Sequence, residues 1–198
     1  MHVSQVKRQP GMLVVKAGKP LWRPRRHLPR GIVPPNLSSW LFDTSSLTQR
    51  LRQACHGRFQ VRVVSEAQAR PLRDERVALE MRGHEGAVVR MVYLLCDGRP
   101  WVFARTVIPL RTLSGPQRRL AYLGSKPLGE MLFADKSMRR SEVEVARLAA
   151  GSTVFSMATQ ALEHAPDEIW GRRSVFHLQN KPLLVSEIFL PDLLENES

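Results

Sequence analysis

Three charged side chains fall on predicted strand faces that are otherwise apolar: Arg90, Arg105 and Glu187. Residues two apart in a strand share a face. By this rule Arg90 lies among Val92, Leu94 and Cys96, and Arg105 lies among Trp101, Phe103 and Val107. Glu187 lies among Leu183, Val185 and Phe189. A charge in such surroundings is costly to bury alone, so it needs an opposite charge or a ligand with matching groups. A guanidinium can hold a carboxylate, and a glutamate can bind a hydroxyl or take a proton.

Two predicted hairpins position these residues. In the first, apolar runs between Arg90 and Pro109 flank Asp97-Gly98, a dipeptide typical of tight hairpin turns because glycine supplies a positive φ. The second runs from Ser174 to Leu190 and turns at 179–182. The sequence contains no internal repeat beyond these two hairpins.

Paired helices are expected on either side of the first hairpin. One pair begins at Trp40 after the capping serines 38–39, is interrupted over 43–46 and resumes over 47–54. The other starts at Pro116, reaches about Leu123, and continues from Pro127 through Leu132. Two such pairs could act as flaps over a site.

The remaining segments are predicted as follows. Residues 59–66 form a strand, and 71–84 are irregular. Residues 141–147 alternate as a strand, with a helix running to Ala150 as the alternative. Residues 149–168 contain a helix capped by Ser152-Thr153 that packs outside the site. The pattern indicates an α+β domain with a mainly antiparallel sheet.

Charge is concentrated at the N-terminus. The net charge is +12, and residues 1–42 hold eight of the thirty Lys and Arg and no Asp or Glu. Six prolines fall within residues 1–38, so we expect an arm with at most a short strand at 12–16, anchored on the core by residues 22–24. A basic arm could contact nucleic acid or anionic lipid, but a solvated arm is the more ordinary interpretation. The acidic residues 192–198 are expected to form a frayed tail.

Cysteine and histidine usage predicts neither a disulfide nor a metal site. Cys55 and Cys96 are interpreted as reduced thiols, and the six histidines show no ligand spacing. No apolar run approaches the ~20 residues that span a bilayer, and none resembles a secretory signal. We therefore expect a cytoplasmic protein without stable membrane insertion.

The order and spacing of several blocks resemble chorismate pyruvate-lyase over roughly residues 39–191. These blocks are Cys96-Asp97-Gly98 with Pro100-Trp101, Arg105-Thr106-Val107-Ile108-Pro109, Thr112-Leu113-Ser114-Gly115-Pro116, Leu123-Gly124, Pro127-Leu128-Gly129, Trp170-Gly171-Arg172-Arg173-Ser174, and residues 181–191, which read KPLLVSEIFLP. The 149–168 segment departs from the family, where a shorter link is expected.

The resemblance implies a single domain with a six-stranded antiparallel sheet and helical flaps over a buried ligand. The domain would span 39–191, between the basic arm 1–38 and the tail 192–198. The implied reaction converts chorismate to 4-hydroxybenzoate and pyruvate without a cofactor or metal and supplies the ubiquinone ring. An RNA-binding protein would rest on charge alone and lacks the interleaved exposed aromatics of a single-strand reader, so we expect no nucleic-acid partner, and we expect a monomer.

The resemblance also assigns roles to residues. Arg90 matches the arginine that binds the ring carboxylate, and Glu187 the glutamate that meets the ring hydroxyl. Leu47 and Leu128 match flap positions that close over the ligand. Arg105 is a candidate for the enolpyruvyl carboxylate. Glu187 could be the general base, or the substrate's own enol carbon could take the proton.

Other interpretations remain open on the residues alone. Arg90 and Glu187 could be partners in structural ion pairs, and Leu47 and Leu128 could be core residues. Arg172 and Arg173 could brace the sheet or face solvent. A ligand-binding module like the effector domains of GntR-type regulators is the alternative to an enzyme, although residues 1–38 are too short and Pro-rich for a winged helix.

Overall fold

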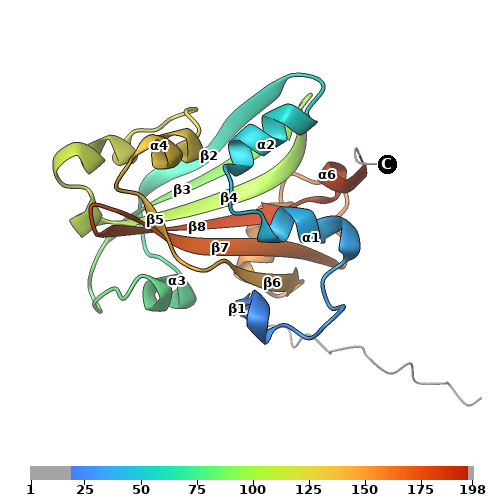
Figure 1. Ribbon diagram of the computed structural model, residues 1–198, viewed down its shortest axis with the longest axis horizontal. Coiled ribbons are helices and arrows are strands. Elements are labelled where there is room, and N and C mark those ends of the chain that lie inside the picture. The colour runs from blue at the N-terminus through green and yellow to red at the C-terminus, as the bar shows by residue number, and fades with distance from the viewer. Residues whose placement is uncertain (1–18, 196–198) are drawn as a thin grey trace, which may run out of the picture.

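The computed structural model describes residues 19–195, which fold into one α+β unit built on an antiparallel sheet (Figure 1). The predicted short strand at 12–16 lies outside the described residues. The strands are β1 (Arg23–Pro24), β2 (Phe59–Ala69), β3 (Ala87–Cys96), β4 (Arg99–Pro109), β5 (Arg139–Arg140), β6 (Glu144–Ala149), β7 (Glu168–Leu178) and β8 (Lys181–Phe189). Their order is β1-β6-β7-β8-β4-β3-β2, and β5 also pairs with β7.

The expectation of six strands was wrong, because the described part of the chain has eight. Two of them, β1 and β5, contain only two residues each. Such short strands leave no alternating pattern in a sequence, so periodicity could not find them.

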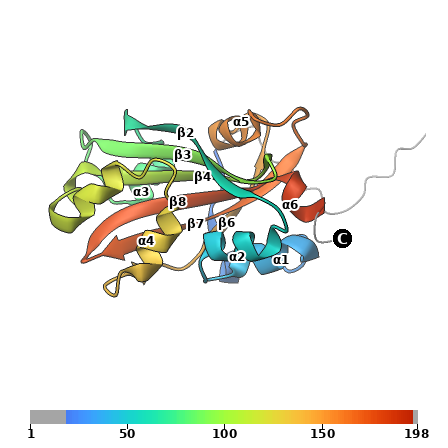
Figure 2. The ribbon, with the colours of Figure 1, turned by 90° about the horizontal axis from the view of Figure 1, so that it is seen from above.

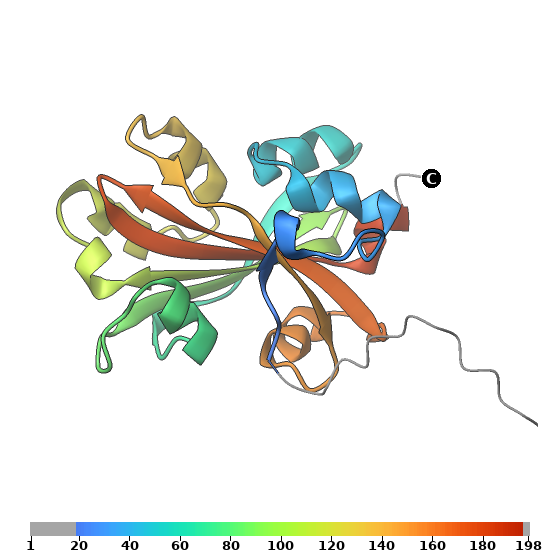
Figure 3. The same cartoon turned by 60° about the horizontal axis from the view of Figure 1, so that its bottom comes forward.

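The helices are η1 (Arg25–His27), α1 (Pro35–Phe42), α2 (Leu47–Ala54), α3 (Arg73–Ala78), η2 (Leu110–Thr112), η3 (Gly115–Ala121), α4 (Leu128–Ala134), α5 (Thr153–Thr159) and α6 (Pro191–Glu195), where η denotes a 3₁₀ helix. Helices α1, α2 and α4 cover one face of the sheet, and α3 and α5 lie on the other (Figures 2 and 3). We call α1 with α2 the first flap, and η3 with α4 the second flap. None of the described helices is long and apolar enough to cross a membrane.

Both predicted hairpins are present, and each turns through two residues of positive φ. These are Asp97 (48°) and Gly98 (81°) between β3 and β4, and Gln179 (49°) and Asn180 (66°) between β7 and β8. Two consecutive residues of positive φ form a tight turn whose twist matches the right-handed twist of the flanking strands, which suits a two-residue hairpin. The two hairpins meet where β4 pairs with β8, and this brings their charged residues into one sheet.

A register shift in the first hairpin changes one predicted face. Leu94 pairs with Val102 but Leu95 pairs with Pro100, so Trp101 occupies a bulge. Trp101 consequently packs in the same core cluster as Val102, not on the face of Arg105 as alternation predicted.

Each flap has its own apolar contact with the sheet. Trp40 and Leu51 of the first flap pack with Val102, and Leu120 of the second flap packs with Ile108 and Leu183. The flaps are therefore attached at their outer ends by separate clusters.

Several helix boundaries differ from expectation. Helix α1 begins at Pro35 rather than Trp40, because proline is well suited to a first helical position, where its missing N–H is not needed. The 71–84 segment contains α3, whose Glu75 accepts a hydrogen bond from the backbone N–H of Leu72 at 2.8 Å. The acidic tail is not frayed at its start, since α6 buries Leu193.

The segment after the second flap follows the strand prediction. Strand β6 forms where a helix was the alternative, and α5 follows it, with Ser152 accepting a hydrogen bond from the N–H of Phe155. Helix α5 packs on the face opposite the flaps, with Phe103 and Ile188. The insertion therefore lies outside the space between sheet and flaps, as predicted.

Cys55 and Cys96 form a disulfide, so the expectation of two reduced thiols was wrong. Cys55 follows α2, and Cys96 ends β3 opposite Phe59, which brings the two Cα atoms to 5.7 Å. The spacing of 41 residues gave no sign of this contact, because it depends on how the first flap returns to β2. The bridge ties the end of the first flap to the sheet.

The folded unit starts before the boundary placed at Ser39. Strand β1 pairs with β6, the Trp22 indole donates to Asp74 at 3.1 Å, and Leu28 and Ile32 pack against the core. Residues 22–24 thus anchor the N-terminal segment, as expected.

Candidate functional site

Arg90 and Glu187 lie on the same face of the sheet, beneath the flaps. Arg90 on β3 pairs with Thr106 on β4, which pairs with Val185 on β8, and Glu187 follows Val185 by two residues. Because neighbouring strands are ~4.8 Å apart, the strands that carry the two charges are separated by about 10 Å. This separation leaves room for a small ring between the two side chains.

A small cavity of about 50 Å³ lies between this face and the flaps. A single water needs at least ~10–15 Å³ by this measure, so the closed cavity has room for a few waters, and a ring-sized ligand requires the flaps to move. The floor residues are Val61, Arg90, Val92, Leu94, Ala104, Thr106, Arg140, Arg172, Phe176, Val185 and Glu187, and the roof residues are Ser45, Leu47, Thr48, Pro127, Leu128, Gly129, Leu132 and Phe133.

Arg90 is held at the end of the cavity nearest the second flap. Its side chain is 3% exposed, and Nη2 donates to the carbonyl oxygens of Gly124 (2.8 Å) and Lys126 (3.1 Å). Nε lies 3.4 Å from Glu66 Oε1 but has no hydrogen-bond partner among the described residues. Burial lowers the pKa of Arg90, and Glu66 opposes that shift. These contacts hold the Arg90 guanidinium in place and leave its Nε donor without a hydrogen bond among the described residues.

Glu66 also positions the second flap. Its carboxylate accepts the backbone N–H groups of Leu123 (3.1 Å) and Gly124 (3.0 Å). Gly124 has a φ of 52°, a conformation that glycine adopts without steric cost. Glu66 is directly opposite Arg90 in the β2–β3 register, so one charged pair joins the sheet to this flap.

Glu187 is paired with Arg172. The two residues are opposite each other on β8 and β7, and Arg172 Nε donates to Glu187 Oε2 at 2.5 Å. Arg172 is 1% exposed, and its Nη1 also donates to the carbonyl oxygens of Trp40 (2.7 Å) and Asp43 (2.5 Å). Arg172 therefore orients Glu187 and binds the end of α1 at the same time.

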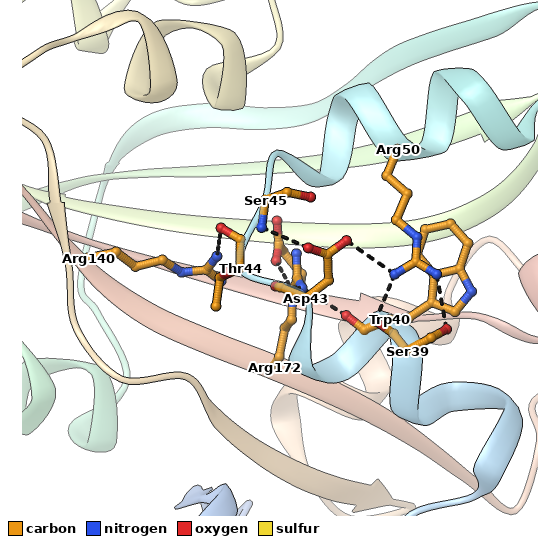
Figure 4. A network of polar contacts seen from close by, with 9 residues as sticks. Ser39, Trp40, Asp43, Thr44, Ser45, Arg50, Arg140 and Arg172 are labelled. Atoms are coloured by element: carbon orange, nitrogen blue, oxygen red, sulfur yellow. Dashed lines mark hydrogen bonds and ion pairs between the residues drawn. The ribbon is translucent and has the colours of Figure 1, made fainter.

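Arg140 is the third arginine of the cavity. It reaches from β5 to Ser174, whose Oγ accepts from Nε at 3.0 Å, and Nη1 donates to the carbonyl oxygen of Thr44, also at 3.0 Å. Burial lowers the pKa of Arg140; Glu187 raises it, Arg172 lowers it further, and Asp43 raises it. Figure 4 shows Arg140 and Arg172 approaching the 43–45 turn from different sides.

The turn between α1 and α2 is held by its own polar network (Figure 4). Asp43 accepts the N–H of Ser45 at 2.7 Å and an Arg50 Nη1 donor at 3.2 Å. Arg50 also donates to the carbonyl oxygen of Ser39 at 2.7 Å and covers the Trp40 ring at 3.7 Å. Burial raises the pKa of Asp43, but hydrogen bonds from Ser45 and Arg50 outweigh it and leave the pKa below its ordinary value. The turn is thus rigid where it meets the two arginines.

Leu47 and Leu128 line the cavity from the first and the second flap. Both leucines begin a helix with no side-chain hydrogen bond at the preceding cap residue, and both are buried. Gly129 lies against the first flap, where a Cβ atom would be 3.2 Å from Thr48 Oγ1, so a larger residue there would crowd the closed arrangement. On the outside, Arg52 of α2 forms an ion pair with Glu130 of α4.

The structure does not bring Arg105 into this cavity. Arg105 lies on the opposite face of the sheet, where Nε and Nη2 donate to the two oxygens of Glu75 at 2.6 and 3.0 Å. Both side chains are 4% exposed, so this is a buried ion pair between β4 and α3. Its partner was missed because α3 was not predicted.

Arg172 and Arg140 were not among the predicted site residues. The sequence held a signal for Arg172, because the two-residue turn at Gln179-Asn180 fixes the register that places Arg172 opposite Glu187. For Arg140 there was none, since it lies on the two-residue strand β5. Within residues 19–195 no cluster of His, Cys, Asp or Glu could hold a metal ion.

Comparison with known proteins identifies the family. The family model described as chorismate lyase matches residues 18–198. This chain belongs to the chorismate lyase family. It is 43% identical over 158 residues to a protein of Methylococcus capsulatus named "Probable chorismate pyruvate-lyase", covering 80% of this chain and 96% of the relative. A protein of the same name from Azoarcus sp. is 43% identical over 178 residues, covering 88% and 91%.

The fold of this chorismate lyase family member is shared with regulator domains. A crystal structure of a GntR-family transcriptional regulator from Bacillus cereus matches with a TM-score of 0.50 and 9% identity, covering 68% of this chain and 92% of that one. Identity at this level shows a common architecture alone.

Proposed function

We propose that this protein cleaves chorismate to 4-hydroxybenzoate and pyruvate in the cavity beneath the flaps. The observation that carries the proposal is the placement of Arg90 and Glu187 on one sheet face, at two sides of a cavity that both flaps cover. Family membership supports the same reaction. The proposal includes a monomeric cytoplasmic enzyme that needs no cofactor and whose product supplies the ubiquinone ring.

In this proposal the ring lies flat between sheet and flaps. The ring carboxylate binds Arg90, whose Nε lacks a hydrogen-bond partner among the described residues. A charge-assisted bond to a carboxylate would satisfy that buried donor. Leu47 and Leu128 cover the ring from the two flaps, and apolar side chains such as Val92 and Val185 line its other side.

Glu187 meets the opposite side of the ring, where the hydroxyl and the enolpyruvyl ether are. The reaction removes the proton from the carbon that bears the hydroxyl and breaks the bond between the adjacent ring carbon and the ether oxygen. The electron pair of the C–H bond completes the aromatic ring. The ether oxygen leaves with its three-carbon unit as enolpyruvate, which takes a proton at its methylene carbon and becomes pyruvate.

Two routes deliver that proton. In the first, ionised Glu187 takes it as general base, and Arg172 keeps the carboxylate oriented. In the second, the enol carbon of the substrate takes it directly, and the protein holds the reactive conformer. Both routes use the same binding residues and need no metal or redox group.

A ligand-binding module without turnover is the second candidate, favoured by the fold shared with GntR-family regulators. One experiment separates the two. Purified protein is mixed with chorismate and no additive, and 4-hydroxybenzoate and pyruvate are followed by chromatography. Release of both in a 1:1 ratio supports the lyase. Binding of chorismate without products supports the module and overturns our proposal.

A further inference from the structure

The three arginines of the cavity differ in how much of their hydrogen-bonding capacity is already used. Arg172 donates to Glu187 and to two backbone carbonyl oxygens. Arg140 donates through Nε and Nη1 only, and its Nη2 has no hydrogen-bond partner within residues 19–195. No carboxylate in that part of the chain forms an ion pair with Arg140, although Arg90 and Arg172 each have one.

Arg140 also stands at the boundary between two spaces. It lines the inner cavity, and with Phe133 it lines an adjoining outer pocket of about 410 Å³ that reaches Phe42 and Met138. The outer pocket is lined by a second cation, Arg25, and by one carboxylate, Glu142, which forms an ion pair with Arg26. The inner cavity alone is small, so the outer pocket supplies the space for a substituent that extends beyond the ring.

Arg140 and Arg90 lie on opposite sides of the cavity. Arg90 is on β3 and Arg140 on β5, and β4, β8 and β7 come between them in the sheet. Glu187 on β8 lies between the two arginines, so a ligand that spans the cavity from Arg90 past Glu187 arrives at Arg140. Such an arrangement suits a molecule with two anionic groups at opposite ends.

We propose that Arg140 binds the second carboxylate of the substrate, on the three-carbon enolpyruvyl unit. This inference rests on the proposed function, because it takes the ring carboxylate to be on Arg90. The three-carbon unit then lies toward the outer pocket, with its carboxylate on Nη2 of Arg140. The same contact distinguishes chorismate, which has two carboxylates, from 4-hydroxybenzoate, which has one.

The test compares Arg140→Met with Arg139→Met. Arg139 is the exposed neighbour on β5 and donates to Asn180, so its variant removes one charge from the same strand without touching the cavity. The steady-state kcat/KM for chorismate and the Kd for 4-hydroxybenzoate are measured for the wild type and both variants. Arg140→Lys, which keeps the charge, is measured beside them.

We expect Arg140→Met to affect turnover of chorismate and binding of 4-hydroxybenzoate to different extents. Arg140→Met lowers kcat/KM for chorismate by at least about 30-fold, the low end for truncating one partner of a buried charge pair, and changes the Kd for 4-hydroxybenzoate by less than about threefold. Arg140→Lys recovers part of the loss, and Arg139→Met resembles the wild type. Equal losses in both measurements would show that Arg140 only holds the flap, and unchanged kcat/KM would also overturn the assignment.

Failure of this inference is distinguishable from failure of the proposed function. A wild-type protein that does not turn over chorismate overturns the proposed function before any variant is considered. An active wild type together with a fully active Arg140→Met variant overturns only the role of Arg140. If Arg140→Met does not fold, Arg140→Lys carries the test, with a loss in kcat/KM and an unchanged Kd expected.

Discussion

Arg90 and Arg105 have similar sequence surroundings but lie on opposite faces of the sheet. Both were predicted on apolar strand faces of one hairpin, and both are buried. Arg105 is matched by both oxygens of Glu75, whereas Arg90 Nε has no hydrogen-bond partner in the described chain. The Glu75 carboxylate already occupies Nε and Nη2 of Arg105, whereas Arg90 beside the cavity has a donor available to a ligand.

Arg90→Ala should therefore weaken binding of 4-hydroxybenzoate. We expect a loss of ~2–5 kcal/mol, as for removing one partner of a buried charge pair. The matched control is Lys126→Ala, which removes a nearby exposed charge but leaves the backbone carbonyl that accepts from Arg90. Calorimetric titration measures both. Unchanged affinity in a folded Arg90→Ala protein would assign Arg90 a structural role only.

Glu187→Gln separates binding from catalysis. Glutamine keeps the shape and the carbonyl acceptor but cannot take a proton. We expect the Kd for 4-hydroxybenzoate to stay within about tenfold, or ~1.4 kcal/mol, and kcat/KM for chorismate to fall far more. Near-wild-type turnover would contradict a role as general base and would leave the substrate's enol carbon as the proton acceptor.

The residue pattern predicted part of this site. Alternation placed Arg90 and Glu187 on apolar faces, and the resemblance to the family added the flap positions Leu47 and Leu128. Alternation through the two-residue turn would place Arg105 opposite Arg90 on one face. The bulge at Trp101 shifts the register by one residue, so Arg105 pairs with Met91 and lies on the face that α3 covers. Arg140 was invisible for a related reason, since a two-residue strand leaves no periodic signal.

At the scale of elements, the first flap is held to the sheet at its central turn and at the end of α2. The 43–45 turn is held by Arg140 and Arg172, and the end of α2 is joined to β3 by the Cys55–Cys96 disulfide. The first turn of α2, at Thr48, lies against Gly129 of the second flap. This part must move for a ring to enter the cavity.

The disulfide should contribute measurably to stability. Closing a loop over a sequence separation of 41 residues removes chain entropy worth roughly 4 kcal/mol in the chain-entropy account. For a domain of this size that corresponds to a drop in Tm of roughly 10 °C on reduction. Thermal unfolding with and without reductant measures it, and the Cys55→Ser/Cys96→Ser double variant is the control that reductant should not affect. An unchanged wild-type Tm on reduction would contradict the bridge.

Some elements could be predicted from local sequence patterns, and others could not. The two hairpins followed from alternation around turn residues of positive φ, and the flap helices from apolar spacing with proline and glycine at their ends. The disulfide and the bulge at Trp101 depend on how distant elements meet. Local patterns contain no information about those contacts.

At the scale of the whole molecule, positive charge is distributed unevenly along the chain. Residues 1–42 carry a large share of the positive charge, and the cavity is built from residues 45–187. The N-terminal segment touches the rest through Trp22 and β1, on the edge of the sheet next to β6. An anionic substrate would be attracted by the basic field, and Arg25 of this segment lines the outer pocket beside Arg140.

Deleting residues 1–20 should leave turnover within a few-fold of wild type. Deleting residues 1–27 removes Trp22 and β1 as well, and with them the hydrogen bond to Asp74 and the cation–π contact of Arg173. We expect the longer deletion to lower Tm while the shorter one does not. Steady-state kinetics and thermal unfolding of both truncations measure this, and a soluble, folded but inactive 1–20 deletion would show that the segment builds the site.

The most direct test of the central claim is a crystal structure of the protein with 4-hydroxybenzoate. The account predicts the ring in the cavity between sheet and flaps, its carboxylate within hydrogen-bonding distance of Arg90 and its hydroxyl near Glu187. Leu47 and Leu128 would cover it. Product bound elsewhere, or an empty cavity at saturating product, would contradict the assignment of this cavity as the site where chorismate is cleaved.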